Sequence, residues 1–441
     1  MTSGPLRAQR RHEAARRSSL GFWLVAVTYA IVMMGGTLPI PLYRFWSETM
    51  HFAAFETTAI FAVYAFGVLV SLLVFASLSD QLGRRPVLIG ALVVLGISTA
   101  LFLVASTLTG LLITRFVFGL AAGVVTATAN AALAELARPD RSQVAPAMST
   151  VANMGGLGLG SVAAGVVARF CDDPTHMVFW WYLIALGIAV VAVLVVPETV
   201  TRQAGFRLRL DLRRPSLPGA DRRTFLGMLG LVFAAFAVNG VFSSLVPAFV
   251  RDQLHIHDSL ASSALVSVVF FAALLAQVAP RPQWLSGPLA GPTILIVGAF
   301  IFEAGLLAGS LLGFVLGTAV AGAGVGLVFS RGIGATQRLA DPDRRADFVA
   351  TYFLAAYIGS TIPTLGLGVL NETLGTAPST LILFGVIVVV TIVSTALVAH
   401  HPSRTDPATH PDPKGHHHDS LHRHQRPGQR HRRPTPPGWL H

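Results

Sequence analysis

Ionisable residues lie inside long apolar segments of the sequence, where a charge is costly. Arg115 lies in the apolar segment 110–134, and Glu303 lies in the segment 290–309. A charged side chain in an apolar environment usually serves a function, because its burial costs free energy. An arginine of this kind can organise a cavity, and a carboxylate can carry a proton. For Arg115 an interfacial role is the alternative, since it lies near one end of its segment and its long side chain can extend into water.

A short polar loop after the second apolar segment places an acid beside basic residues. It reads Ala76-Ser77-Leu78-Ser79-Asp80-Gln81-Leu82-Gly83-Arg84-Arg85-Pro86. Glycine permits a tight reversal of the chain, and Asp80 is placed to interact with the positive N-terminal end of a neighbouring helix. The alternative is a loop whose arginines only set the orientation of the adjoining segments.

Small residues recur at helical spacing after Arg115 and again in the segment 145–168. They are Gly119 and Gly123 in the first case, and Gly156, Gly160 and Gly165 in the second. Residues four apart share one face of a helix, and small residues there allow two helices to approach closely. Both segments are therefore expected to pack tightly against neighbouring helices.

Composition excludes most other classes of protein. The 441 residues are 53% hydrophobic and only 12% charged, against about 25% charged in soluble domains. The net charge of +11 does not indicate a nucleic-acid partner, because the arginines lie between apolar segments and not on one folded face. A single cysteine, Cys171, excludes a disulfide framework or a multi-cysteine metal site. No cofactor is expected. Paired carboxylates, clustered histidines and nucleophile–base pairs are missing from the apolar segments, so we expect no enzyme.

Twelve apolar segments are long enough to cross the roughly 30 Å of hydrocarbon in a bilayer. They are approximately 20–42, 56–78, 86–106, 110–134, 145–168, 177–197, 225–249, 260–280, 290–309, 312–334, 347–370 and 379–399. The chain is thus predicted to be an all-α membrane protein in a lipid bilayer. The first helix is expected to break at Pro39 and Pro41, before Tyr43, either as a kink or as a site where freed carbonyls serve a ligand.

Basic residues alternate between successive loops, as the positive-inside rule requires. The loops on one side contain only Arg44, Arg169 and Arg251, whereas nearly all other arginines lie on the side of the two termini. We therefore predict that both termini are cytoplasmic and that the protein is a multi-pass protein of the inner (plasma) membrane.

The chain divides into two similar halves. One constant shift aligns Gly119 with Gly322, Gly123 with Gly326, Gly156 with Gly359 and Gly165 with Gly368. The predicted parts are a basic cytoplasmic N-terminus (1–19), an N-terminal six-helix half (20–197), a cytoplasmic linker (198–224), a C-terminal six-helix half (225–400) and a disordered tail rich in His, Pro and Arg (401–441). The tail is expected to lie at the anionic inner leaflet, and its histidines define no metal site.

The loop containing Asp80, Gly83, Arg84 and Arg85 resembles the signature loop of the major facilitator superfamily, with Ala76 and Gln81 departing from the pattern. The helix 4 motif, Arg115, Gly119 and Gly123, is similar to the second motif of that family. The helix 5 motif, Gly156, Gly160 and Gly165, resembles the motif of its antiporters, with Ser161 and Ala164 as departures, and simple packing is the alternative. The pattern is most similar to the 12-helix drug/proton antiporter-like group.

The resemblance implies two six-helix pseudo-repeats around a central cavity, in a monomeric protein. It implies that Asp80 meets the start of the eleventh helix near Arg345 and acts as part of a conformational switch. It nominates as substrate-cavity residues Tyr29, Asn130, Asn239 and Arg331. Glu303 is the candidate proton carrier, although its helix is peripheral in this family.

The function predicted from these features is alternating-access transport of a small organic solute, namely proton-coupled efflux of a lipophilic or amphiphilic compound. The alternatives are uptake or facilitated transport of a sugar or other metabolite, and a transporter-like sensor that binds without transport.

Overall fold

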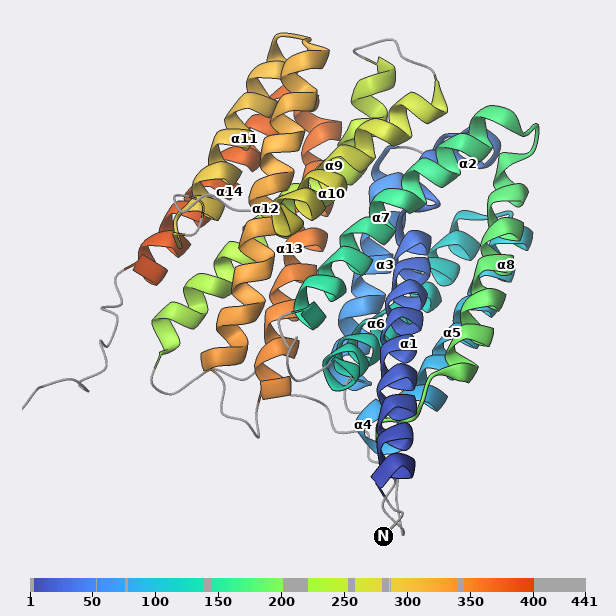
Figure 1. Ribbon diagram of the computed structural model, residues 1–441. Helices are drawn as coiled ribbons and strands as arrows, with labels where there is room; N and C mark the ends of the chain where they lie inside the picture. Colours follow the sequence, from blue (N-terminus) through green and yellow to red (C-terminus); the bar gives the residue numbers. More distant parts are fainter. Residues whose placement is uncertain are drawn as a thin grey trace, which may run out of the picture. The chain divides into compact units, whose positions relative to one another are not determined.

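The computed structural model describes residues 4–52, 54–75, 78–137, 144–200, 221–252, 258–279, 285, 287–339 and 345–399. Every regular element in these ranges is a helix (Figure 1). The compact unit that contains them runs from Met1 to His401. The prediction of a disordered tail at 401–441 lies outside the described residues, as does most of the predicted linker.

The predicted all-α fold with twelve membrane-crossing helices is confirmed. Twelve helices in the described part of the chain are long and apolar enough to span a bilayer. The first half contains α1 (Gly4–Thr37), α3 (Ala54–Val74), α5 (Arg84–Val104), α6 (Leu108–Leu136), α7 (Val144–Phe170) and α8 (Pro174–Val195). The second half contains α9 (Arg222–Asp252), α10 (Ser259–Val278), α11 (Ala290–Leu307), α12 (Leu311–Leu339), α13 (Arg345–Leu374) and α14 (Thr376–Ala399). Three short elements, η1 (Ile40–Leu42), α2 (Tyr43–Met50) and α4 (Leu78–Leu82), complete the first half.

Consecutive spanning helices are antiparallel, so the bundle has two ends that the chain visits alternately. We call the end at which α1 begins and α14 ends the proximal end, and the other the distal end. The sequence predicts that the proximal end faces the cytoplasm.

Equivalent helices pack in the same way in the two halves, through glycines that the sequence alignment paired. A Cβ atom at Gly156 of α7 would lie 2.4 Å from the carbonyl oxygen of Ala30 in α1, and one at Gly359 of α13 would lie 2.3 Å from that of Phe233 in α9. The internal repeat is thus visible in the backbone contacts as well as in the sequence.

The two halves meet along two helix pairs, α7 with α10 and α3 with α13. Gly165 and Gly368, the last two glycines that the alignment pairs, lie in these helix pairs. A Cβ at Gly165 would lie 2.4 Å from the Ser263 hydroxyl of α10, and Gly368 lies against Thr58 of α3. In each half, a glycine of the fifth spanning helix (α7 or α13) thus packs against the second spanning helix of the other half (α10 or α3), near the distal end.

Two helices expose much of their apolar surface. Only 33% of the most apolar stretch of α8 and 28% of that of α14 is buried. The exposed side chains on α8 include Trp180, Trp181, Ile188 and Val191. In a membrane protein such faces lie against lipid, which is as apolar as the side chains themselves.

We predict that Gly119→Ala destabilises the protein, because the new Cβ would lie 2.2 Å from the Tyr64 carbonyl oxygen of α3. Forced separation of closely packed groups costs about 1–3 kcal/mol. Gly96→Ala is the matched control, since nothing lies within 4 Å of its Cβ position. Thermal unfolding in detergent should show a lower midpoint for the first variant and an unchanged or higher one for the second. Equal midpoints would show that the α3–α6 contact is not tight.

Candidate functional site

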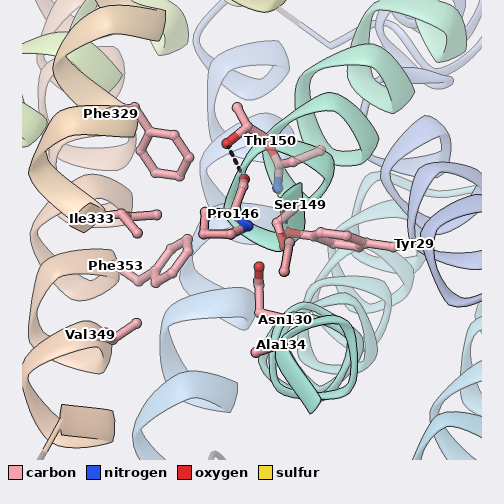
Figure 2. Close-up of a pocket in the computed structure, with 12 residues that line it drawn as sticks. Tyr29, Asn130, Ala134, Pro146, Ser149, Thr150, Phe329, Ile333, Val349 and Phe353 are labelled. Atoms are coloured by element: carbon pink, nitrogen blue, oxygen red, sulfur yellow. Dashed lines mark hydrogen bonds between the residues drawn. The ribbon is translucent and has the colours of Figure 1, made fainter. Parts of the chain in front are cut away.

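A cavity lies between the two halves near the proximal end. Its volume is about 530 Å³, including the part that is open to solvent. The first half contributes Tyr29, Asn130, Ala134, Ala145, Pro146, Ser149, Thr150 and Asn153, and the second half contributes Phe329, Ile333, Val349 and Phe353. Figure 2 shows the side chains from α12 and α13 in a row on one side of the space, facing those from α1, α6 and α7 on the other.

The wall from the first half is polar. The Asn153 amide nitrogen of α7 donates to the Tyr29 hydroxyl of α1 at 2.8 Å, and Thr126 and Asn130 of α6 lie beside the same hydroxyl. The Asn130 amide nitrogen donates to the Thr126 carbonyl at 2.7 Å. These bonds fix the orientation of two amides and one phenol, each with hydrogen-bonding capacity on the cavity side.

The wall from the second half is aromatic and aliphatic. The rings of Phe329 and Phe353 lie edge to face, with centroids 5.8 Å apart. Behind them lies the ring of Phe236 in α9. Its centroid is 5.4 Å from that of Phe329 and 6.1 Å from that of Tyr357. Aromatic pairs of this geometry stabilise one another, so the apolar wall is supported by a connected cluster.

The sequence-predicted cavity residues separate into two groups. Tyr29 and Asn130 line the described cavity together. Asn239 and Arg331 are not among its described lining residues. Asn239 is buried in α9, and the Arg331 guanidinium donates to the carbonyls of Leu285 and Gly287 in the α10–α11 connection.

Arg115 is completely buried, with 0% of its surface exposed. Its Nε and Nη2 atoms donate to the Tyr43 hydroxyl at 3.1 and 2.5 Å, and Nη1 donates to the Gly36 carbonyl at 3.2 Å. The guanidinium also lies over the rings of Tyr43 and Tyr64, at 5.7 and 5.2 Å from their centroids. The side chain therefore does not extend into water, and it is held by neutral oxygens and aromatic faces.

The broken first helix creates this binding site for the guanidinium. α1 ends at Thr37, and the 3₁₀ turn around Pro39 and Pro41 leads into α2, which begins at Tyr43. The last carbonyls of a helix have no partner within it, and they carry partial negative charge. The kink expected from the sequence is present, and the Gly36 carbonyl at the end of α1 accepts from Arg115; service of these carbonyls to a ligand stays a prediction.

The signature loop forms an ion-pair cluster at the proximal end. The Arg84 guanidinium donates to Asp80 at 2.5 Å, to the Ser79 hydroxyl at 2.6 Å and to Glu135 of α6 at 2.7 Å. Thr199, after α8, donates to the other oxygen of Glu135 at 2.5 Å. The predicted contact of Asp80 with the start of α13 stays a prediction, and Asp80 makes further interactions besides these.

Glu198 joins the end of the first half to the same loop. Its carboxylate accepts from the backbone N–H groups of Arg84 and Arg85, at 2.8 and 3.1 Å, at the first turn of α5. An acidic side chain is favourable there because those N–H groups have no partner within the helix. Gly83 makes this approach possible: it has φ +99°, and a Cβ atom on it would lie 2.7 Å from the Glu198 carboxylate.

Glu303 lies apart from the cavity, between α11 and α14. It is 6% exposed, and one carboxylate oxygen accepts from the Thr380 hydroxyl at 3.0 Å. The second oxygen is buried without a hydrogen-bond partner. The position is peripheral, as the sequence led us to expect.

Polar contacts close the distal part of the α7–α10 pair. Ser161 donates to the Ser263 carbonyl at 3.2 Å, and Ser267 donates to the Gly158 carbonyl at 2.9 Å. At its distal end, Arg169 pairs with Asp258, which also caps α10 by accepting from Leu260 and Ala261. The halves are thus joined distally and separated by the cavity proximally.

Sequence reasoning missed three residues that complete these sites. Asn153, which is not among the cavity residues nominated from the sequence, lines the cavity. Tyr43 was named only as the end of a kink, and Glu135 was not singled out. An acid in the last turn of an apolar helix, facing a loop with arginines, was the available signal for Glu135; nothing in the spacing indicated Tyr43 as the partner of Arg115.

The chain is similar in sequence to one family of known proteins. Residues 25–292 match the model of the Major Facilitator Superfamily. No curated protein matches the chain in sequence.

Solved structures of transporters share the fold. A POT family transporter in complex with 5-aminolevulinic acid superimposes with a TM-score of 0.68 at 15% identity, covering 87% of this chain and 96% of that one. The human organic anion transporter MFSD10 (TETRAN) superimposes with a TM-score of 0.63 at 17% identity, covering 86% of this chain and 99% of that one. A third structure is a bacterial homologue of the human lysosomal transporter Spinster in an inward-facing and unoccupied conformation. It superimposes with a TM-score of 0.61 at 14% identity, covering 87% of this chain and 95% of that one.

We predict that Tyr43→Phe lowers stability by about 1.5–3 kcal/mol, because the buried guanidinium loses the hydroxyl that accepts two of its N–H groups while the ring is kept. Tyr182→Phe is the matched control: its hydroxyl donates to the Val32 carbonyl, at 3.3 Å, and has no charged partner among the described residues, so its removal should cost about 1 kcal/mol. In an Arg115→Met background the Tyr43 effect should largely vanish, measured by chemical unfolding. Equal costs of the two tyrosine changes would contradict this account.

We predict that Gly83→Ala is more harmful than Gly309→Ala. Both glycines have positive φ, +99° and +62°, but nothing lies within 4 Å of a Cβ at Gly309. Gly309→Ala carries a backbone penalty of about 1–2 kcal/mol, and Gly83→Ala carries one of about 1–3 kcal/mol, because φ +99° with ψ 154° is a conformation that essentially only glycine adopts. Gly83→Ala should add about 1 kcal/mol, since it displaces the Glu198 carboxylate from the start of α5. The added cost should disappear in a Glu198→Ala background, as read from thermal unfolding; its persistence there would disprove the cap.

Proposed function

Because this chain belongs to the Major Facilitator Superfamily, we propose that it is a secondary active transporter that exports a lipophilic or amphiphilic organic solute by alternating access, in exchange for protons. The observation that carries this proposal is the cavity between the halves, which lies proximally while the α7–α10 contacts join the halves distally.

Alternating access requires two interfaces that open in turn. Opening the distal end would separate Arg169 from Asp258 and the α7 serine and glycine from α10. The polar contacts of the described residues there include a partly exposed ion pair, and exposed pairs contribute only about 0–1 kcal/mol. The distal interface is therefore suited to repeated opening.

The proximal cluster would act as the switch on the opposite face. Arg84, Asp80 and Glu135 hold the loop between α3 and α5 against the end of α6. If Asp80 also meets the start of α13 when the cavity closes, the same cluster would stabilise one state of the cycle over the other. A differential contact of this kind is what a conformational switch needs.

The direction of export follows from the predicted orientation. A proximal cavity facing the cytoplasm would take up solute there, and the aromatic wall suits a molecule that partitions into the inner leaflet. Glu303 is the proposed proton carrier, because a buried carboxylate beside a hydroxyl can bind and release a proton. Arg115, held at the broken end of α1, is proposed to fix the shape of the first half around the cavity.

The proposal is tested by transport in proteoliposomes. Labelled lipophilic amphiphiles, sugars and amino acids are offered with and without an imposed pH gradient. A variant with Arg169→Cys and Asp258→Cys in a Cys171→Ser background is compared before and after crosslinking with a short bifunctional thiol reagent. We expect gradient-driven movement of amphiphiles, blocked by a crosslink that holds the distal end closed.

Glu303→Gln should abolish the response to the pH gradient, whereas Glu372→Gln, at an exposed position near the end of α13, is the matched control and should keep it. If a sugar or metabolite instead crosses the membrane without a pH gradient, the proposal of proton-coupled export is wrong and facilitated transport takes its place. Transport that continues in the fully crosslinked protein would exclude alternating access at this interface.

A further inference from the structure

The two walls of the cavity differ in chemistry, and neither supplies a charge. Of its described lining residues, Tyr29 is the only one with an ionisable side chain; the others are amides, hydroxyls, aliphatic groups and phenyl rings. The polar groups lie on the first half and the large apolar groups on the second (Figure 2).

We propose that the solute held here is an uncharged amphiphile, with its hydrogen-bonding groups toward α1, α6 and α7 and its apolar part against α12 and α13. The inference rests on the proposed function, because it specifies the solute of the same cavity.

Nearby charges are held by other groups. Glu135, next to the lining residue Ala134, is bound by Arg84 and Thr199. Arg331, two residues before the lining residue Ile333, donates to the carbonyls of Leu285 and Gly287. Arg115 lies farther away, in the distal part of α6, where it is completely buried against Tyr43 and Gly36. A charged solute in the cavity would therefore lose its hydration without gaining a counter-charge from the described lining, which is unfavourable.

The polar wall is suited to groups that both donate and accept hydrogen bonds. The Asn130 amide has one N–H engaged, to the Thr126 carbonyl, whereas the Asn153 amide nitrogen donates both to the Tyr29 hydroxyl and to the Met33 sulfur and leaves its amide oxygen as the acceptor. Ser149 adds a hydroxyl to the same wall. An amide, alcohol or carbonyl of the solute would find both donors and acceptors there.

The opposite wall is suited to a hydrocarbon or an aromatic ring. Phe329 and Phe353 present phenyl groups that are kept in place by their contact with each other and with Phe236. Ile333 and Val349 extend the apolar surface along α12 and α13. A ligand that buries its apolar part here gains free energy in proportion to the area covered.

The test uses three probes with one skeleton and three head groups: 6-phenylhexanamide, 6-phenylhexanoate and 6-phenylhexyltrimethylammonium. Binding to the unmodified protein in lipid nanodiscs is measured by calorimetry, with protein-free nanodiscs subtracted. We expect the amide to bind at least about tenfold more tightly than either ion, because only the ions lose hydration without compensation.

Two variants test the assigned orientation. Asn130→Leu should weaken amide binding, with Asn371→Leu, outside the described lining, as the matched control. Phe353→Ala should weaken binding of the amide, with Phe300→Ala, 62% exposed on the outer surface of α11, as its control. An effect of the control changes as large as that of the cavity changes would overturn the assignment of the site.

The comparison of head groups does not depend on any variant folding. Equal or tighter binding of the anion or the cation would overturn the proposal of an uncharged solute, while leaving alternating-access transport standing. Failure of the amide to bind up to its solubility limit would overturn it as well. Failure of the crosslinking experiment would instead count against transport and leave the binding result valid.

Discussion

The close approach of helix backbones at small residues is the constraint on which the rest of this structure depends. In lipid, helices gain little from burying apolar side chains against one another, so association relies on van der Waals contact and hydrogen bonds at short range. Gly119 on the Tyr64 carbonyl and Gly156 on the Ala30 carbonyl are such contacts. They fix α3, α6, α1 and α7 relative to one another, and these helices position the polar wall of the cavity.

The same principle separates rigid from mobile interfaces. Within one half, Gly119, Gly156 and Gly359 each lie nearest to a backbone carbonyl oxygen, whereas between the halves the atoms nearest to Gly165 and Gly158 belong to the side chains of Ser263 and Phe271. Side chains can shift by rotation, but backbone contacts cannot be altered without moving a whole helix. The halves are therefore expected to move as bodies, with the α7–α10 and α3–α13 seams as the places where they separate.

Two kinds of polar cluster perform different tasks in the first half. The distal cluster around Arg115 holds a fully buried cation with the neutral groups of Tyr43, Tyr64 and the end of α1, and ties a broken helix to α6. The proximal cluster around Arg84 is partly exposed and links a loop to α6 and to the end of α8. In the described part of the second half, Thr318 is aligned with Arg115 by the same shift and bonds to its own helix, and the phenyl rings of Phe302 and Phe314 pack nearby. The asymmetry of the cavity walls is part of this wider difference between two similar halves.

The sequence by itself determined the twelve spans, the repeat and the break after α1, because each depends on local composition or on spacing along one chain. Apolar length decides a span, proline ends a helix, and a shifted alignment reveals a duplication. The family resemblance nominated four cavity residues, of which Tyr29 and Asn130 are among the described lining residues and Asn239 and Arg331 are not. Only the tertiary structure decided that Arg331 turns to the carbonyls of Leu285 and Gly287, and that Tyr43 holds Arg115. Which way a polar side chain faces is set by the rotation of its helix against several neighbours, and that rotation is fixed by contacts between residues far apart in the chain.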